Sequence, residues 1–195
     1  MKLTHNVIFS LVSVSLLILS ASATAQTKTS ATGQESTLLK ASGSKTGTSL
    51  GLSAAKSAEH TTLLQLLEAS GLLKKANDKG PYTVFAPTNA AFSQLPDGEL
   101  SELLLPSSKQ RLIQFLAYHV VKGRLTSDQL KDGQNLTNLT GQILVVHKQG
   151  NSMTIKDGRG TVAEVLQADV RATNGVVYSV NRVLQRTVNK GPIVR

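Results

Sequence analysis

The sequence predicts an α+β domain in which helices come first, with one early strand, and an antiparallel sheet follows. Apolar residues recur mainly with helical spacing between residues 57 and 133, whereas short apolar runs separated by turn dipeptides occupy the last third of the chain. Helical and strand patterns do not alternate, which argues against βαβ units. The length of 195 residues allows one domain with tails, or at most two very small domains.

The first predicted helix contains four leucines within residues 63–67 and ends at a glycine cap. A short strand rich in β-formers follows at residues 82–86, and Pro87 ends it. Thr88 or Asn89 is then expected to cap a helical turn, because either side chain can accept a hydrogen bond from a free backbone N–H.

Three further helices are expected before the sheet. Leu100–Leu105 is predicted to be helical up to Pro106, and the next helix starts at Ser107 or Ser108. The apolar face of that helix consists of Leu112, Ile113, Phe115, Leu116 and Val120. Residues 126–129, Thr-Ser-Asp-Gln, have the capping-box pattern and predict a short helix before Gly133.

The last third of the chain predicts an antiparallel meander. Its short strands are separated by the turn dipeptides Gly150-Asn151 and Asp157-Gly158. The expected strand segments are 143–146, 153–155, 161–163, 164–168 and 175–184.

Residues 1–25 have the layout of a secretory signal peptide. Lys2 supplies the positive charge, residues 7–19 form an apolar stretch, and Ala23-Thr24-Ala25 is an A-x-A cleavage site. The apolar stretch is shorter than the roughly 20 residues that a spanning helix needs. We therefore expect an exported protein, periplasmic or extracellular, with no integral membrane segment after cleavage.

Composition predicts the remaining domain boundaries. Residues 26–52 are rich in Ser, Thr and Gly without apolar periodicity, which is typical of a disordered linker. The folded domain is then expected at residues 53–188, with a short C-terminal tail at 189–195.

The composition also excludes several classes of function. The chain has no cysteine, so disulfide scaffolds, thiolate zinc sites and cysteine nucleophiles are excluded. The formal net charge is +9, and removal of Lys2 with the signal peptide leaves +8, which favours an acidic partner. The cations are scattered and lack interleaved aromatic residues, so nucleic-acid binding is not expected. No GxSxG, HExxH or Walker-type motif occurs, so we expect no catalysis and no cofactor.

Three ordered blocks resemble the signatures of the fasciclin domain family. The blocks are residues 83–92 (TVFAPTNAAF), residues 118–121 (YHVV) and residues 173–184 (TNGVVYSVNRVL). The resemblance covers residues 53–186 and implies N-terminal helices packed on an antiparallel β-sheet wedge or sandwich. It also implies a non-catalytic role in cell adhesion.

The resemblance nominates binding positions within these blocks. They are Thr83, Val84, Phe85, Pro87, Thr88, Asn89, Tyr118, His119, Asn174, Gly175, Tyr178 and Asn181. Family members usually carry acidic residues where this chain has Asn89 and Ala90, and His and Asp where it has Tyr178 and Asn181. These departures remove charge from positions associated with adhesion or metal-linked roles.

Most of these positions also have a purely structural interpretation. Val84 and an alternating neighbour are expected to pack inward, unless the strand is an exposed binding strand with an open edge. His119 is expected to be a hydrogen-bonded core residue, because neither His60 nor His147 forms a metal-ligand pair with it. Asn174-Gly175 predicts a turn before the closing strand, because Gly and Asn both tolerate a positive φ.

The strand after this turn has two faces. Val176, Tyr178 and Val180 share one of them, and Val177, Ser179 and Asn181 share the other. Tyr178 is interpreted either as a surface contact or as the cap of the sheet.

Two functions remain open at this point. The resemblance implies a secreted module that associates with cell-surface or matrix components, with anionic polysaccharide as a possible partner. The alternative is a periplasmic binding protein for a lipid or another small apolar ligand. Two Asn-Leu-Thr sequons, at Asn135 and Asn138, are potential glycan acceptors. The sequence leaves the oligomeric state open.

Overall fold

The computed structural model describes residues 47–78 and 80–187. The predicted signal peptide, residues 26–46 of the predicted linker and the C-terminal tail lie outside the described residues. The helical elements are α1 (Leu50–Ala55), η1 (Ala58–His60), α2 (Thr61–Ser70), η2 (Lys75–Asn77), α3 (Asn89–Phe92), α4 (Glu99–Leu104), η3 (Pro106–Ser108) and α5 (Lys109–Tyr118). The strands are β1 (Tyr82–Pro87), β2 (Val120–Lys122), β3 (Asn135–Thr137), β4 (Ile143–Gln149), β5 (Ser152–Lys156), β6 (Val162–Ala172) and β7 (Gly175–Val180).

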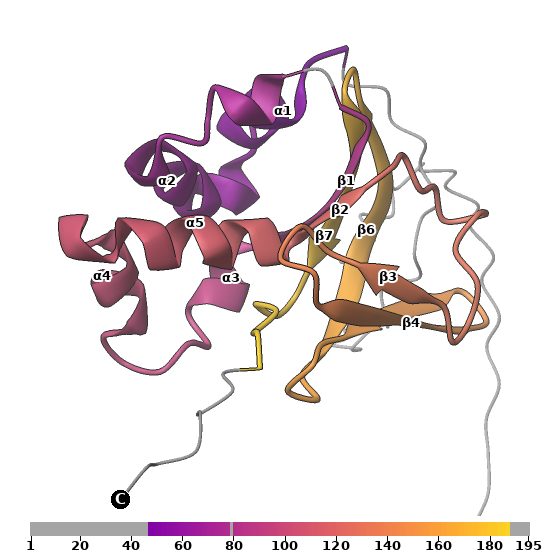
Figure 1. The fold of residues 1–195 in the computed structure, drawn as a ribbon. Helices are drawn as coiled ribbons and strands as arrows, with labels where there is room; N and C mark the ends of the chain where they lie inside the picture. Colours follow the sequence, from indigo (N-terminus) through magenta and orange to yellow (C-terminus); the bar gives the residue numbers. More distant parts are fainter. Residues whose placement is uncertain (1–46, 79, 188–195) are drawn as a thin grey trace, which may run out of the picture. The chain divides into compact units, whose positions relative to one another are not determined.

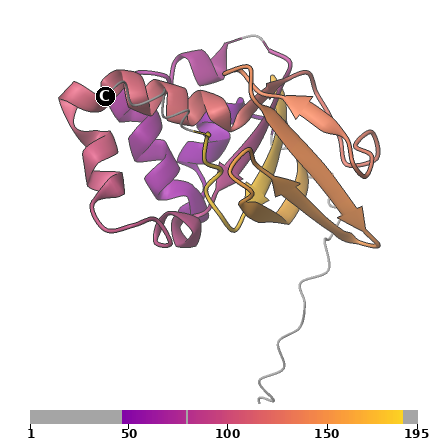
Figure 2. The same cartoon turned by 60° about the horizontal axis from the view of Figure 1, so that its bottom comes forward.

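The strands form one seven-stranded sheet in the order β2-β1-β7-β6-β5-β4-β3. Neighbouring strands are antiparallel except for β1 and β7, which run parallel. The helices lie on one side of the domain and the strands on the other in both ribbon views (Figures 1 and 2). The predicted α+β class and the meander of the last third are confirmed.

The long strand β6 connects the two halves of the sheet. Its pairing with β7 shifts register twice, between Val165 and Gln167 and between Gln167 and Val170. Such bulges bend a strand and increase its twist. The two edge strands of the sheet, β2 and β3, therefore come close to each other. Val121 of β2 forms a bridge with Asn138, which follows β3. The N–H of Leu139 also donates to the carbonyl of Val120 at 2.8 Å.

Two apolar clusters stabilise the domain. The sheet cluster is enclosed by the bent sheet and consists of Phe85, Tyr118, Val121, Leu130, Leu136, Leu144, Val146, Met153, Ile155, Ala163, Val165, Ala168, Val176, Tyr178, Val180 and Leu184. The helix cluster joins the helices to the other face of β1 and consists of Leu63, Leu66, Ala86, Ala91, Phe92, Leu103, Leu112, Leu116 and Val183. The two faces predicted for β7 are confirmed, because Val176, Tyr178 and Val180 belong to the sheet cluster and Val177 packs against the helix cluster.

Several local predictions are wrong. The helix α5 ends at Tyr118, so Val120 lies on β2 instead of the helical face. The capping-box residues form a single turn: the Thr126 N–H donates to Gln129 Oε1 at 3.1 Å, but no helix follows. The side-chain contact of the motif therefore forms without the helix. Helix α1 begins at Leu50, so the last residues of the predicted linker are helical.

Candidate functional site

A cavity of about 330 Å³ lies between helices α1, α2 and α5 and the sheet. Its lining comes from four neighbouring strands as well as the helices. The apolar part of the lining includes Leu63, Leu67, Val84, Ile113, Leu116, Val120, Val170 and Val177. Its size is within the range of small-molecule sites, about 300–1,000 Å³. The arrangement can accommodate a small apolar molecule.

A short chain of hydrogen bonds is the main polar feature of this cavity. The His60 Nδ1 lies 2.8 Å from Ser57 Oγ, and the His60 Nε2 lies 3.0 Å from Ser179 Oγ. All three residues line the cavity. Burial lowers the pKa of His60, and this effect exceeds the opposing effects of a backbone hydrogen bond with Ala86 and of the Glu59 charge. The ring is therefore uncharged at neutral pH and held at both nitrogens.

His119 is a buried structural residue, as the sequence predicted. Its Nδ1 lies 2.9 Å from the carbonyl oxygen of Phe115, and its Nε2 accepts a hydrogen bond from the N–H of Leu184 at 3.0 Å. These partners define the neutral tautomer with hydrogen on Nδ1. Burial lowers the pKa of His119 to about 4, against the smaller opposing effect of the Phe115 carbonyl.

Tyr118 anchors the turn between β5 and β6. Its hydroxyl accepts a hydrogen bond from the N–H of Gly158 at 3.2 Å, and burial raises its pKa. The preceding Asp157 is also buried and accepts bonds from the N–H groups of Thr161 at 2.8 Å and Gln185 at 2.7 Å. Tyr118 and Asp157 thus join this turn to α5 and to the C-terminal segment.

The first signature block forms β1 and the start of α3. Strand β1 pairs with β2 on one side and with β7 on the other, which excludes an exposed binding strand with an open edge. Phe85 belongs to the sheet cluster, and Thr83 donates from Oγ1 to the carbonyl of Gly123 at 2.8 Å. Pro87 is the last residue of β1, and Thr88 caps α3 through its side chain.

Asn89 holds the beginning of helix α2. Its Oδ1 accepts a hydrogen bond from the N–H of Thr62 at 3.0 Å and from Thr61 Oγ1 at 3.2 Å, and its Nδ2 donates to the carbonyl of Ala58 at 2.9 Å. Asn89 therefore has a structural role between α3 and the α2 N-terminus.

Asn174 of the second block connects three elements. Its Oδ1 accepts from the N–H of Leu50 at 2.9 Å, and its Nδ2 donates to the carbonyls of Ala76 at 2.9 Å and Asp78 at 2.8 Å. The turn predicted at Asn174-Gly175 is confirmed, and neither residue has a positive φ in it. Glycine is needed for space: a Cβ on Gly175 would lie 2.2 Å from the carbonyl oxygen of Tyr82.

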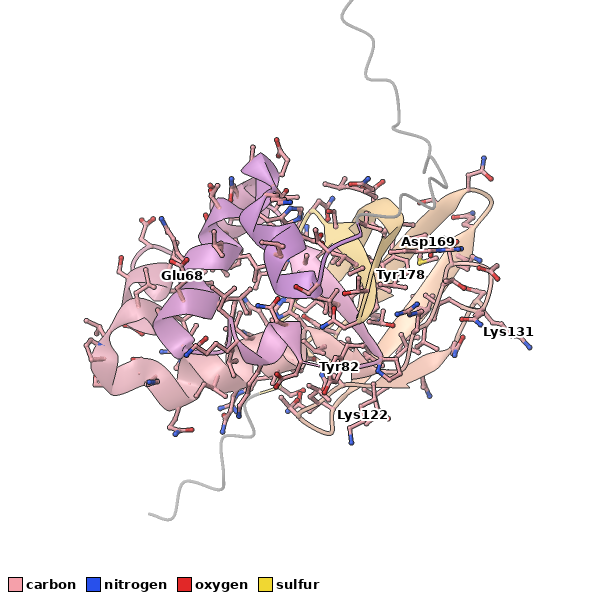
Figure 3. All side chains as sticks on the ribbon, turned by 90° about the horizontal axis from the view of Figure 1, so that it is seen from above. Glu68, Tyr82, Lys122, Lys131, Asp169 and Tyr178 are labelled. Atoms are coloured by element: carbon pink, nitrogen blue, oxygen red, sulfur yellow. The ribbon has the colours of Figure 1, made fainter. Side chains whose placement is uncertain are left out.

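Tyr178 lies in the sheet cluster and is fully buried, which excludes the surface contact and places its ring inside the core. Its hydroxyl donates to the carbonyl of Leu125 at 2.8 Å and lies 3.1 Å from Asp169 Oδ1. Burial, and then the charge of Asp169, raise the pKa of Tyr178. Figure 3 shows both residues on the sheet side of the domain. Asn181 accepts from the N–H of Glu164 at 2.8 Å, so it too supports the sheet.

The sequence and the fold of this chain match those of known proteins. The model of the fasciclin domain matches residues 58–186. The chain belongs to the fasciclin domain family. It is 40% identical over 126 residues to protein sll1483 of Synechocystis, covering 64% of this chain and 66% of that protein. It is 42% identical over 107 residues to immunogenic protein MPB70 of Mycobacterium bovis, covering 55% of this chain and 51% of that protein.

Two more distant matches agree with this assignment. The chain is 37% identical over 128 residues to transforming growth factor-beta-induced protein ig-h3 of Oryctolagus cuniculus, covering 66% of this chain and 18% of that protein. A solved FAS1 domain pair from the insect cell adhesion molecule fasciclin I has the same fold, with a TM-score of 0.56 and 16% identity. The match covers 71% of this chain and 51% of that one. The chain thus spans less than two thirds of each of these relatives.

Fasciclin domains are linked to cell adhesion and the extracellular matrix and are generally non-catalytic. Among the nominated fasciclin positions of this chain, three line the cavity: Val84, Phe85 and His119. The others support the scaffold, as described above. The sequence-based nomination missed His60, Ser57 and Ser179. The spacing of Ser57 and His60 was the local signal, but Ser179 is 119 residues from His60.

A second surface feature is the basic sheet end, which we define as the exposed side chains of Lys74, Lys75, Lys122, Arg124 and Arg171. Backbone contacts place these residues at one end of the sheet. Lys122 pairs with Tyr82, Arg171 pairs with Val176, and the Arg124 side chain donates to the carbonyl of Thr173 at 2.8 Å. Asn174 binds the segment that carries Lys74 and Lys75 through the carbonyls given above. Figure 3 shows Lys122 beside Tyr82.

Two other candidate features can be placed. Asn135 is exposed, whereas Asn138 is buried and its Oδ1 accepts hydrogen bonds from Thr140 and Gln142.

Within residues 47–78 and 80–187, no three His, Asp or Glu side chains are grouped as metal ligands would be. No helix in the same residues has the length and apolar character needed to cross a bilayer.

Proposed function

We propose that this chain is an exported, non-catalytic fasciclin module that attaches to anionic polysaccharide of the cell surface or extracellular matrix through the basic sheet end. The observation that carries the proposal is the grouping of five exposed cationic side chains at one end of the sheet. Apart from Lys74 and Lys75 at η2, the helical segments have the opposite balance: Glu59, Glu68, Asp97, Glu99 and Glu102 outnumber Lys56, Lys109 and Arg111. The acidic residues beside the basic sheet end are Asp78 and Asp128, fewer than its five cations. An anionic surface is therefore attracted to one end of the domain and repelled by the helices.

The organisation of the sheet supports a side-chain mode of attachment. Strands β2 and β3 are joined through Val121 and Asn138, so neither edge is open for another strand along this contact. The signature positions are mostly buried and hydrogen-bonded within the domain. The exposed charges at the basic sheet end are therefore the groups that would contact the polysaccharide. Binding by a single domain is expected to be weak, and many copies of the domain on one surface would bind more strongly.

The proposal is tested by binding of the purified domain to alginate-coated beads, with neutral dextran beads as a reference. The variant Lys74→Ser/Lys122→Ser removes two charges from the basic sheet end. The matched control, Lys131→Ser/Lys156→Ser, removes two exposed charges elsewhere. We expect the first variant to lose most binding and the second to keep most of it, with binding falling as salt rises. Equal loss in both variants, or equal binding to dextran, overturns the assignment to this surface.

Export is tested separately in the source cells. A signal peptide at residues 1–25 leads us to expect the processed chain in the periplasmic or extracellular fraction, beginning at Gln26. Subcellular fractionation followed by N-terminal sequencing measures this. Recovery of unprocessed chain in the cytoplasmic fraction contradicts the proposal.

The cavity favours a second candidate function, binding of a small apolar ligand. Its volume of about 330 Å³ and its largely aliphatic lining are the supporting observations. Native mass spectrometry of the natively purified protein tests this candidate. A co-purifying molecule that is released by Val84→Trp, a substitution that fills the cavity, supports it. An unloaded protein that also fails to take up apolar probes argues against it.

A further inference from the structure

We infer that the cavity binds an elongated, uncharged molecule with a single hydroxyl group, and that this hydroxyl is held by Ser179, whose own hydroxyl is oriented by His60. This inference rests on the second candidate function and assigns the chemical class of its ligand. It follows from the shape of the cavity, from the charges around it and from the hydrogen bonds inside it.

The lining gives the cavity an elongated shape across the sheet. Val170 lies on β6, Val177 on β7, Val84 on β1 and Val120 on β2, and these are four successive strands of the sheet. Adjacent strands are about 4.8 Å apart, so these side chains span roughly 14 Å. The volume of about 330 Å³ lies at the lower end of the range for small-molecule sites, about 300–1,000 Å³. An unbranched chain of about ten carbons fits both limits.

The charges around the cavity favour an uncharged ligand. Of the residues that line it, only Lys75 carries a permanent charge, and that side chain is exposed at the rim. No carboxylate lines the cavity, and the His60 ring is uncharged at neutral pH. A charged ligand group inside the cavity would lose its hydration without gaining a counter-ion, which is costly.

The hydrogen-bond chain selects a hydroxyl group. A neutral imidazole has one donor and one acceptor nitrogen, and both already contact serine hydroxyls. If Ser179 donates to His60, its oxygen can still accept from a ligand. If Ser179 accepts from His60, its hydrogen can be given to a ligand. A ligand hydroxyl is satisfied in both tautomers, because it can donate or accept, whereas a carbonyl is satisfied only in the second.

The test measures displacement of Nile red, an uncharged dye, by decan-1-ol, n-decane and decanoate. The double variant His60→Leu/Ser179→Ala replaces the polar chain with apolar groups, and Ser107→Ala, at an exposed serine outside the cavity, is the matched control. We expect the double variant to weaken decan-1-ol about five- to tenfold, as for loss of one neutral hydrogen bond. Its affinity for n-decane is expected to change less than about twofold.

A thermal melt verifies that each variant is folded, and Val84→Trp provides a second approach that leaves the polar chain intact. This variant is expected to abolish binding of dye and probes. If decan-1-ol and n-decane respond equally to the double variant, or if decanoate binds more tightly than decan-1-ol, the hydroxyl assignment is overturned while the cavity candidate stands. If no probe binds, or if Val84→Trp leaves binding unchanged, the cavity candidate fails and the inference fails with it.

Discussion

The two faces of strands β1 and β7 differ in how fully they are packed. On the face enclosed by the sheet, Val176, Tyr178 and Val180 of β7 are completely buried, and their ring and aliphatic groups belong to one continuous cluster. On the face toward the helices, Val84 and Val177 are only partly buried and border the cavity. The same two strands therefore pack into the core with one face and line the cavity with the other.

The largest expected effect is a difference in the free energy of unfolding between two Leu→Ala variants, one in the sheet cluster and one in the cavity wall. Leu144→Ala removes a completely buried side chain from the sheet cluster, and Leu67→Ala removes a half-buried one from the cavity wall. We expect Leu144→Ala to lower the free energy of unfolding by about 3–4 kcal/mol, because it creates a void in a packed region. Leu67→Ala is expected to cost about 1 kcal/mol, because its side chain already borders empty space and buries less area. Urea unfolding curves measure both.

Equal costs for the two leucines would contradict the distinction between the faces. Ligand binding gives an independent check, since Leu67→Ala alters the cavity and Leu144→Ala does not touch it. A weaker affinity for apolar probes is expected only in the folded Leu67→Ala variant.

The next effect is a pH dependence that arises from His119. Its pKa is about 4 in the folded protein and near 6.5 when unfolded, so the unfolded chain binds the proton first as the pH falls. The stabilisation is complete above about pH 6.5 and is lost as the pH falls to about 4, a change on the order of 3 kcal/mol. His60 shifts in the same direction and adds to the slope.

Urea unfolding at a series of pH values measures this slope. His119→Gln is expected to be less stable at neutral pH but to show a flatter profile between pH 6.5 and 4. His147→Gln, at an exposed position on β4 where the His147 Nδ1 lies 3.7 Å from Asp132 Oδ1, is the comparison variant for a histidine outside the core. A profile in His119→Gln as steep as that of the wild type would contradict this role.

The predictable parts of the fold are those whose signals are local. The Gly150-Asn151 and Asp157-Gly158 dipeptides correctly placed the turns of the β4-β5-β6 meander. The Thr88 cap and the glycine after α2 are likewise read from adjacent residues. Such features depend on backbone geometry over a few positions, so the sequence alone specifies them.

The parts that were missed depend on contacts between distant segments. The parallel pairing of β1 with β7 joins Tyr82 to Gly175, and no turn signal encodes such a pair. Strands β2 and β3 have three residues each, too few for a periodic pattern. The candidate site was missed for the same reason, because His60 meets Ser179 only after β7 has paired with β1.

A smaller effect concerns the attachment of α1 to the sheet. Asn174→Ala removes three hydrogen bonds that connect β7 to α1 and to the η2 segment. At about 0.5–1.5 kcal/mol each, with some recovered by water, we expect a cost of about 2 kcal/mol. Hydrogen exchange is expected to accelerate in residues 50–55 more than in β4 and β5, because only the helical side is loosened. Asn151→Ala, at an exposed turn, is the control and should leave exchange in α1 unchanged.

The smallest effect tests whether a fasciclin signature position acts through structure or through binding. Asn89→Ala removes the side chain that receives the Thr62 N–H at the start of α2, and we expect a cost of about 1 kcal/mol, as for loss of an N-terminal cap. Asn89→Asp introduces the acidic residue that is usual in the family. It keeps the acceptor and places a negative charge at the helix N-terminus, which offsets the lost donor, so its stability is expected to lie within about 0.5 kcal/mol of wild type. If Asn89→Asp alters bead binding while its stability stays near that of wild type, position 89 acts at a binding surface. If neither variant alters binding while Asn89→Ala is destabilised, the signature residue serves the helical scaffold above the cavity.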